Sequence, residues 1–232
     1  MPNKEMIFVD TANRKLHIHD KYGVYSRSAR LNGKPRDATP AGQNLVVVRY
    51  HGWNWFELFD ISDGNNMISK KLFRRAVFRN EIIFNSYDSG CTIDVHRTSG
   101  AVLTSVSKER KSIFSHITAY GKRVYFIDSD QKTIRLSTDV KTCKLNWLKY
   151  VDIIEKNSIT SGRNGYAYVT QICRNTLLVL NFDLKLKKEV ILYGLHRNIN
   201  LTGISIDRQN NKLLVCSVDG LAYLYDVHIP EY

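Results

Sequence analysis

The stretch Asn200–Val227 contains three short apolar runs separated by two polar turns. The run LTGISID precedes the turn RQNN, KLLVCS precedes VDG, and LAYLYDV ends the stretch. The runs are rich in β-branched and aromatic residues, and the Asn, Asp and Gly of the turns tolerate the backbone angles of a tight reversal. This pattern predicts a three-stranded antiparallel meander. Because a lone meander cannot bury both of its faces, the rest of the chain has to supply similar units beside it.

Similar units do recur along the chain. The segments that align with KLLVCS are MIFVD (6–10), NLVVVRY (44–50), EIIFNSY (81–87), RVYFIDS (123–129), YAYVTQI (166–172) and KLLVCS itself (212–217). Their starts are roughly 37 to 46 residues apart, which is the repeat length of a propeller blade of four strands. After each comes a second strand and then a more polar outer strand, which includes KLNWLKY (144–150) in the fourth unit and EVILYGL (189–195) in the fifth. Short inner strands rich in small residues join the units.

The sequence therefore predicts an all-β chain that forms one six-bladed β-propeller over residues 1–232. The blades are expected at about 1–33, 34–73, 74–107, 108–156, 157–196 and 197–232. The first blade lacks its inner strand and the last lacks its outer strand. Since a closed propeller needs both strands, we expect the chain to be the C-terminal part of a longer protein.

Aspartates recur at the end of the strand that follows each of the segments aligned with KLLVCS. An aspartate at this place can accept hydrogen bonds from the backbone N–H groups of the next turn. The predicted turn-closing residues are Asp20, Asp60, Asp139, Asp183 and Asp226.

Two segments resemble NHL repeats. Ile7–Ala38, IFVDTANRKLHIHDKYGVYSRSARLNGKPRDA, has a strand ending in Asp, a polar loop with Asn, an Ile/Leu-rich strand ending in Asp, a Gly turn and a Pro before the next blade. Asn211–Val227, NKLLVCSVDGLAYLYDV, resembles the last blade of the NHL propellers that end tripartite-motif proteins, particularly those of invertebrates. The later linkers depart from the repeat, because the proline is kept only at Pro35. WD repeats are a weaker match, since no Gly-His or Trp-Asp dipeptide recurs with the blades.

The resemblance implies a recognition module that binds a protein target or RNA. In tripartite-motif proteins the ubiquitin-ligase activity belongs to an N-terminal RING domain, and this chain has no cysteine/histidine array of that kind. The resemblance therefore implies substrate recognition for a longer parent with an upstream RING, B-box and coiled-coil region. The chain itself is not expected to be an enzyme.

Basic residues gather in the loops that are expected to form one face of the propeller. The chain has 34 Lys and Arg against 22 Asp and Glu, a net charge of +12, which favours an acidic partner. The candidate binding residues are Arg14, Lys15, Arg36, Arg49, Tyr50, His51, Trp53, Arg74, Arg75, Lys108, Arg110, Lys111, Lys132, Arg174 and Arg197.

Two kinds of partner stay open for this face. The loop RYHGWNW (Arg49–Trp55) mixes cations with aromatic rings, as single-stranded RNA requires for phosphate contacts and base stacking. Alternatively, Trp55 packs inside the second blade, Trp53 caps its edge, and the face binds a protein. Lysines and arginines also occur in the loops of the opposite face, so the charge asymmetry is modest.

Catalytic and metal sites are not predicted. His17 and His19 share one face of a strand, but no third ligand is evident. A nucleophile elbow and a Gly-rich phosphate loop are both missing from the sequence, and the inner strands carry few of the acids that hold the metal in six-bladed hydrolases, which leaves a metal-dependent hydrolase as a distant alternative. No cofactor is expected. The four cysteines form no CxxC pair, and no apolar run is long enough to span a membrane, so a cytoplasmic protein without a membrane partner is expected.

Overall fold

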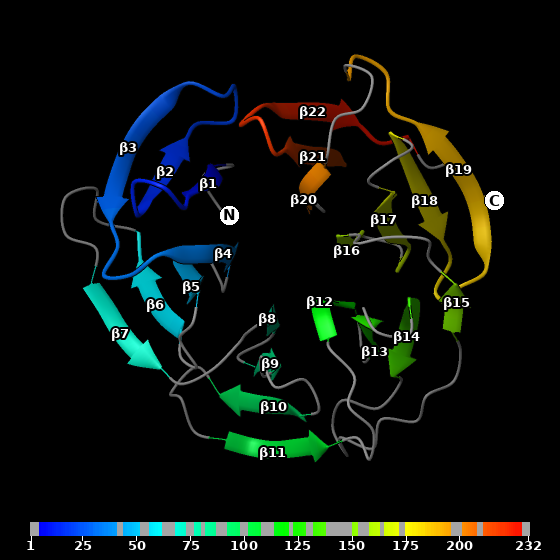
Figure 1. Ribbon diagram of the computed structural model, residues 1–232, viewed down its shortest axis with the longest axis horizontal. Coiled ribbons are helices and arrows are strands. Elements are labelled where there is room, and N and C mark those ends of the chain that lie inside the picture. Colours follow the sequence, from blue (N-terminus) through cyan, green and yellow to red (C-terminus); the bar gives the residue numbers. More distant parts are fainter. Residues whose placement is uncertain are drawn as a thin grey trace. The chain divides into compact units, whose positions relative to one another are not determined.

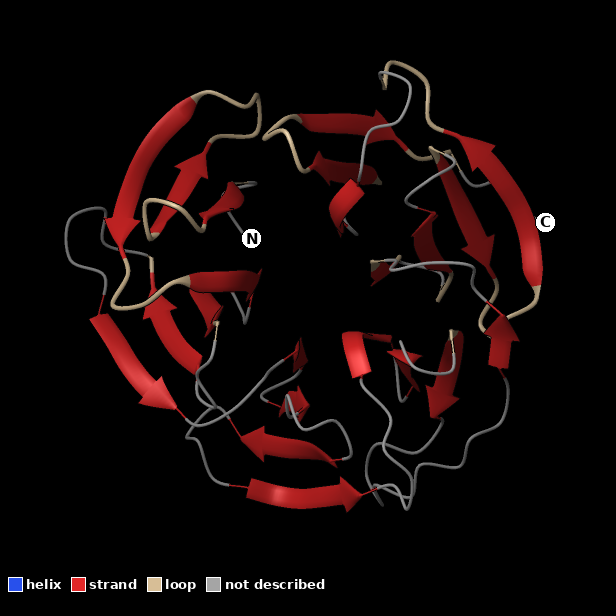
Figure 2. Ribbon diagram, viewed as in Figure 1, coloured by secondary structure: helices blue, strands red, loops and turns tan. Residues whose placement is uncertain are grey.

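The computed structural model of this chain describes residues 5–40, 44–51, 56–61, 68–72, 77–79, 82–86, 92–97, 102–107, 114–120, 123–128, 132–137, 150–152, 158–162, 165–171, 175–195, 201–207 and 211–228. Within these ranges all regular structure is β-strand and no helix occurs (Figure 2). The chain divides into two compact units, the first Met1–Glu109 and the second Arg110–Tyr232.

The described part of the first unit contains three antiparallel sheets, which are coloured from blue to green in Figure 1. Sheet 1 consists of β1 (Met6–Asp10), β2 (Lys15–His19) and β3 (Tyr25–Arg30). Sheet 2 consists of β4 (Pro35–Pro40), β5 (Leu45–Tyr50), β6 (Phe56–Asp60) and β7 (Ile68–Leu72). Sheet 3 consists of β8 (Val77–Arg79), β9 (Ile82–Ser86), β10 (Thr92–Arg97) and β11 (Val102–Ser107).

The described part of the second unit also contains three antiparallel sheets. Sheet 4 consists of β12 (Phe114–Tyr120), β13 (Arg123–Asp128), β14 (Thr133–Ser137) and β15 (Tyr150–Asp152). Sheet 5 consists of β16 (Ile159–Ser161), β17 (Ala167–Gln171), β18 (Thr176–Leu180) and β19 (Leu186–Ile191). Sheet 6 consists of β20 (Leu201–Asp207), β21 (Lys212–Ser217) and β22 (Ala222–Asp226).

The strands follow the predicted order within every sheet. Neighbouring strands pair antiparallel in the order of the chain, and the first and last sheets each have three strands where the other four have four. We call the strands of a four-stranded sheet its first to fourth strands. Sheet 1 begins at the second strand, and sheet 6 ends at the third. The prediction of an all-β chain whose first and last units are each one strand short is therefore confirmed in the described residues.

Two predicted outer strands overlap the observed strands only in part. In sheet 5 the fourth strand covers Leu186–Ile191 rather than 189–195, because Gly194, with φ of 84°, lies in a turn. In sheet 4 the described fourth strand is Tyr150–Asp152, so the predicted strand 144–150 reaches it only at its last residue. Tyr150 pairs with Arg135, and Val151 with Ile134.

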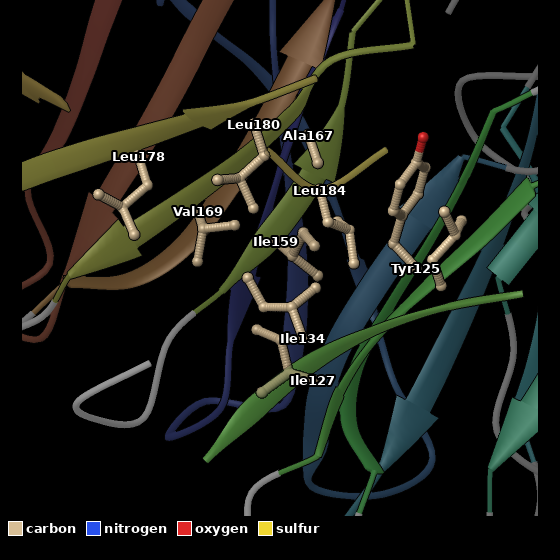
Figure 3. Close-up of a cluster of buried hydrophobic side chains, with 10 residues drawn as sticks. Tyr125, Ile127, Ile134, Ile159, Ala167, Val169, Leu178, Leu180 and Leu184 are labelled. Atoms are coloured by element: carbon tan, nitrogen blue, oxygen red, sulfur yellow. The ribbon is translucent and has the colours of Figure 1, made fainter. Parts of the chain in front are cut away.

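Apolar side chains from neighbouring sheets pack against each other within each unit. In the second unit, β13 and β14 supply four residues of one cluster, while β16, β17, β18 and the turn at Leu184 supply the rest (Figure 3). Its buried members are Tyr125, Ile127, Ile134, Leu136, Ile159, Ala167, Val169, Leu178, Leu180 and Leu184. A similar cluster joins sheets 1 and 2 of the first unit. Because each fully buried side chain of this size contributes about 1.5–3 kcal/mol, these contacts between sheets dominate the stability.

Small polar side chains join the first strands of neighbouring sheets. The Thr118 hydroxyl on β12 lies 3.0 Å from the Ser161 hydroxyl on β16, and Ser161 also donates to the Ala119 carbonyl at 2.9 Å. Both hydroxyls are buried. Their mutual hydrogen bond allows polar residues to lie where the strands come closest, without leaving an unpaired group.

The turn between the second and third strands meets the connection to the next sheet. The Leu31 amide donates to the Arg14 carbonyl, and the Leu192 amide donates in the same way to the Asn175 carbonyl. Arg14 and Asn175 both have left-handed backbone angles, with φ of 55° and 49°. These contacts place the two classes of predicted binding loops at the same end of sheets 1 and 5.

The predicted aspartate accepts the hydrogen bonds of the turn that follows the third strand in sheet 1, but not in sheet 5. The Asp20 carboxylate accepts hydrogen bonds from the Tyr22 and Val24 amides, at 2.8 and 2.9 Å. In sheet 5 the equivalent acceptor is Asn181, which binds the Asp183 and Lys185 amides. The prediction for Asp183 is therefore wrong, because an asparagine two residues earlier already serves as the acceptor.

The Asp10 carboxylate is held in its ionised form by the turn that follows β1. The Asn13 amide and side chain both donate to it at 2.8 Å, and His17 lies 3.2 Å away. These hydrogen bonds, the one from the Asn13 backbone first, lower the pKa of Asp10 to about 2.

We expect this turn to weaken in acid. A lowered pKa stabilises the fold at pH values above the ordinary carboxyl pKa of about 3.9, and this stabilisation is lost as the pH falls toward 2. A carbon-detected NMR titration should give an Asp10 midpoint near pH 2. Replacing the side-chain donor by Asn13→Ala should move the midpoint upward, whereas an unchanged midpoint would contradict the role of that side chain.

Candidate recognition surface

Sequence-distant basic residues meet at one end of sheets 1 and 2. Lys15 on β2 lies directly opposite Arg30 on β3, and the Arg14 carbonyl accepts the Leu31 amide next to Arg30. Arg14, Lys15 and Arg30 are all exposed. Like charges placed opposite each other in a sheet repel, but Asp10 on β1 lies opposite Lys15 on its other side and offsets part of this repulsion. An anionic partner would offset the rest.

The basic surface continues onto sheet 2. The Thr11 hydroxyl donates to the Pro35 carbonyl at 3.0 Å, which ties the β1–β2 turn to the start of β4. The His51 amide donates to the Lys34 carbonyl at 2.8 Å. Lys34, Arg36 and His51 are exposed. We refer to Arg14, Lys15, Arg30, Lys34, Arg36 and His51 together as the basic strip.

The positive charges of this surface lower the pKa of His51. Its pKa lies below the ordinary value, through partial desolvation and then through the positive charges of Arg36, Lys34 and Arg49. His51 is therefore neutral at pH 7. An anion bound on the strip would oppose those charges and raise the pKa of His51.

The carboxylates of these two sheets near the strip are engaged by other residues. Asp37 forms a bidentate ion pair with Arg49 on the next strand. Glu57 is fully buried, where its carboxylate accepts hydrogen bonds from the Tyr50 hydroxyl and from the side-chain Nδ2 of Asn32. Burial and the Glu57 charge raise the pKa of Tyr50. The Asp37 side chain keeps 37% of its surface exposed, and Asp10 on β1 lies opposite Lys15, so the strip is mainly but not purely basic.

The structure thus separates the predicted binding residues of the first unit into two groups. Arg14, Lys15, Arg36 and His51 are exposed on the basic strip. Tyr50 is only 3% exposed, and Arg49 is paired with Asp37, so these two residues support the loop from inside. Sequence reasoning did not select Arg30 because it lies on a strand rather than in a loop. Its signal is the antiparallel register that places it opposite Lys15.

The other predicted residues belong either to the second unit or to the part of the chain outside the described residues. Lys132 is exposed in the second unit, where it has a left-handed φ of 50° at the turn equivalent to that of Arg14. The remaining predictions lie outside the described residues: Trp53, Arg74, Arg75, Lys108, Arg110, Lys111, Arg174 and Arg197.

The two strand histidines of sheet 1 have other contacts. His17 pairs with Asp10, and the His19 ring lies 2.9 Å from the Gly23 carbonyl and packs edge-on against Phe8. In the described part of the chain, no three His, Cys, Asp or Glu side chains are grouped as a metal would require. The described residues also contain no helix long and apolar enough to cross a membrane.

No family model matches this chain, and no curated protein matches its sequence. Solved structures match it over almost its whole length. The β-propeller domain of Cps50 (Swd1) from Myceliophteria thermophila has a TM-score of 0.67 and 11% identity, over 97% of this chain and 80% of that chain. The fold is a β-propeller.

Other propellers of different kinds match to a similar degree. Virginiamycin B lyase from Staphylococcus aureus has a TM-score of 0.63 and 14% identity, over 99% of this chain and 86% of that chain. BamB from Moraxella catarrhalis has a TM-score of 0.58 and 11% identity, over 97% and 82% of the two chains. One of these similar structures is therefore a lyase, whereas the Cps50 (Swd1) structure is described only as a β-propeller domain. At these identities the likeness establishes the propeller architecture alone.

Proposed function

We propose that this propeller is a non-catalytic recognition module that binds an acidic segment of a partner protein through the basic strip. The observation that supports this proposal is that exposed cations of sheet 1 (Arg14, Lys15 and Arg30) and of sheet 2 (Lys34 and Arg36, beside His51) lie where the Thr11–Pro35 hydrogen bond joins the two sheets. We also propose that the propeller has six blades of the NHL type: the six sheets of the described residues support the number of blades, and the repeat pattern of the sequence supports the type.

A protein partner suits this surface better than RNA. Binding of single-stranded RNA draws on exposed aromatic rings for base stacking as well as on cations. Two rings are described in this loop: Tyr50 is buried with its hydroxyl bound to Glu57, and His51 is exposed. An acidic peptide needs only the exposed cations. RNA binding would draw on Trp53, which lies outside the described residues.

The proposed biological setting follows from the resemblance to NHL repeats. In a longer tripartite-motif parent, a module of this kind would hold the target of a cytoplasmic ubiquitin ligase, while the RING domain upstream supplied the chemistry. The repeat pattern of Ile7–Ala38 and Asn211–Val227 supports this setting.

A direct test compares two labelled probes, a ten-residue polyglutamate peptide and a ten-nucleotide oligouridylate, by fluorescence anisotropy with increasing salt. We expect the peptide to bind more tightly, with an affinity that falls as the ionic strength rises. Peptide binding should also raise the pKa of His51 in an NMR titration. The triple variant Arg14→Gln, Lys34→Gln, Arg36→Gln should weaken peptide binding by about tenfold, since each exposed ion pair contributes about 0.2–1 kcal/mol.

The matched control is Lys185→Gln, Lys187→Gln, Lys188→Gln, which removes the same charge from exposed positions of sheet 5. It should retain peptide affinity within about twofold if the strip is the site. Equal losses in the two variants would show that only net charge matters. Tighter binding of the RNA, with a steep dependence on salt, would replace the protein proposal by the RNA alternative.

A further inference from the structure

An exposed serine lies beside the cations that sheet 1 contributes to the basic strip. Ser28 is on β3, the outer strand of the sheet (Figure 1). The register of β2 and β3 places Ser28 opposite His17, and it places Arg30 opposite Lys15. Side chains alternate between the two faces of a strand, so these four side chains share one face, while Ala29 points the other way and is buried against sheet 2. Ser28, Arg30 and Lys15 are all exposed.

The pairing of the two strands brings these side chains close together. Arg14 and Leu31 form a hydrogen-bonded pair, because the Leu31 amide donates to the Arg14 carbonyl. Since hydrogen-bonded and non-hydrogen-bonded pairs alternate, Lys15 with Arg30 is a non-hydrogen-bonded pair, and so is the pair that contains Ser28. Side chains approach most closely in pairs of this kind, and long side chains also reach their diagonal neighbours. A group carried by Ser28 Oγ is therefore within reach of both cations.

The serine and the two cations are available for further contacts. Among the described residues, the Ser28 hydroxyl and the charged groups of Arg30 and Lys15 form no hydrogen bond or ion pair. Asp10 lies opposite Lys15 on β1, but its carboxylate is bound by His17 and by the turn that follows β1. In the described part of the chain β3 pairs only with β2, so its other edge is open to an enzyme.

Sheet 5 shows that the fold accepts a negative charge at the position of Ser28. Equivalent hydrogen bonds of the Leu31 and Leu192 amides align β3 with β19. Counting back three residues from each places Glu189 at the position of Ser28. Glu189 is exposed, although a four-stranded sheet, sheet 4, packs on that side of sheet 5. An acidic group on Ser28 therefore needs no change in the strand.

We propose that Ser28 is a phosphorylation site, and that its phosphate binds Arg30 and Lys15 and closes the sheet 1 part of the basic strip to the acidic partner. A protein kinase would transfer the γ-phosphoryl group of ATP to Ser28 Oγ, with ADP and the hydroxyl proton released. Phosphoserine carries a charge of about −1.5 to −2 at pH 7 and three acceptor oxygens, which suit a guanidinium and an ammonium group together. The effect on the partner rests on the function proposed above, whereas the contact between the phosphate and the two cations does not.

The contact is tested on the full chain with phosphoserine incorporated at position 28 during translation. The matched control carries the same phosphoserine together with Lys15→Gln and Arg30→Gln. In a ³¹P NMR titration the second pKa of a phosphoserine is ordinarily about 6. We expect it to be lower by about half a unit when both cations are present, and to return toward 6 in the control. Equal values in the two proteins would overturn the contact.

The effect on the partner is tested with the polyglutamate peptide. Phosphoserine at position 28 should weaken peptide binding by about tenfold, because it occupies two cations of the strip. Phosphoserine at position 26 is the control, since Ser26 is exposed on the same strand and its hydroxyl accepts a hydrogen bond from Arg27 instead. It should change the affinity less than about threefold. Equal losses at the two positions, or none, would overturn the regulation. Failure of the unmodified protein to bind the peptide would overturn the proposed function, while the ³¹P titration would still decide the contact.

Access to the site is tested with a serine kinase that requires a basic residue at the second position after the serine. Incubation of the folded protein with ATP should place phosphate on Ser28, as located by tandem mass spectrometry. Arg30→Gln should remove most of this phosphate, while its melting curve stays that of the parent protein. Phosphate on other residues with Ser28 unmodified would overturn the assignment of the site.

Discussion

Replacing Arg135 by alanine should destabilise the protein by about 3–5 kcal/mol, because it leaves a buried carboxylate without its cation. Arg135 Nε lies 3.0 Å from the Asp128 carboxylate, and the Asp128 side chain has no exposed surface. Urea unfolding followed by circular dichroism measures the loss as a lower midpoint. A loss below about 1 kcal/mol would show that the ion pair contributes no more than a surface pair does.

Two comparisons separate the ion pair from simple loss of packing. The double variant Asp128→Leu, Arg135→Leu removes both charges and should recover most of the stability. His17→Ala breaks the equivalent pair in sheet 1, where the Asp10 side chain is 23% exposed. That variant should cost less than about 1 kcal/mol, because water can solvate the carboxylate that remains.

Gly162→Ala should cost about 1–3 kcal/mol, because a methyl group at this position overlaps a buried aromatic ring. An added Cβ would lie 2.7 Å from Cε2 of Tyr168 and 3.5 Å from Cδ1 of Ile206. Tyr168 is itself fully buried between sheets 5 and 6, so its ring has little room to move. Differential scanning calorimetry would record the effect as a lower melting temperature.

The matched control for this steric effect is Gly203→Ala in β20. Its added Cβ would meet the Cys216 Cβ at 3.9 Å, an ordinary contact, and we expect no loss of stability. In a Tyr168→Leu background the obstructing ring is absent. Gly162→Ala should therefore lower the melting temperature less in that background than in the parent protein. Equal melting temperatures for Gly162→Ala and Gly203→Ala would show that the ring yields to the methyl group.

Most of the sheet structure could be predicted from the sequence because the same pattern of strands and turns recurs along the chain. The strands Met6–Asp10 and Lys212–Ser217 match their predicted limits, since apolar alternation and turn residues coincide at both ends. The sequence predicts the start of the fourth strand of sheet 5 three residues too late, because Lys187 and Lys188 do not have the character of a buried strand. A fourth strand is exposed, so hydrophobicity marks its position poorly.

The candidate site was less predictable because its chemistry depends on pairs. The sequence shows Arg49 and Tyr50 as members of a basic aromatic loop. Only the structure shows that Asp37 and Glu57 bind them and turn them inward. Conversely, Arg30 belongs to the strip because the register of β2 and β3 places it opposite Lys15. A prediction based on loop residues alone does not include it.

The polar pairs of the hairpins bear on how such a chain could evolve. Asp10 with His17, Tyr50 with Glu57, and Asp128 with Arg135 each join residues seven apart, across the turn between the second and third strands. A duplication, deletion or exchange of one whole hairpin therefore carries both members of such a pair together, whereas the Arg49–Asp37 pair, which joins β5 to β4, would be separated. Each repeat was free to change its polar chemistry independently, so that a propeller can keep its architecture after the sequence likeness among its blades has faded.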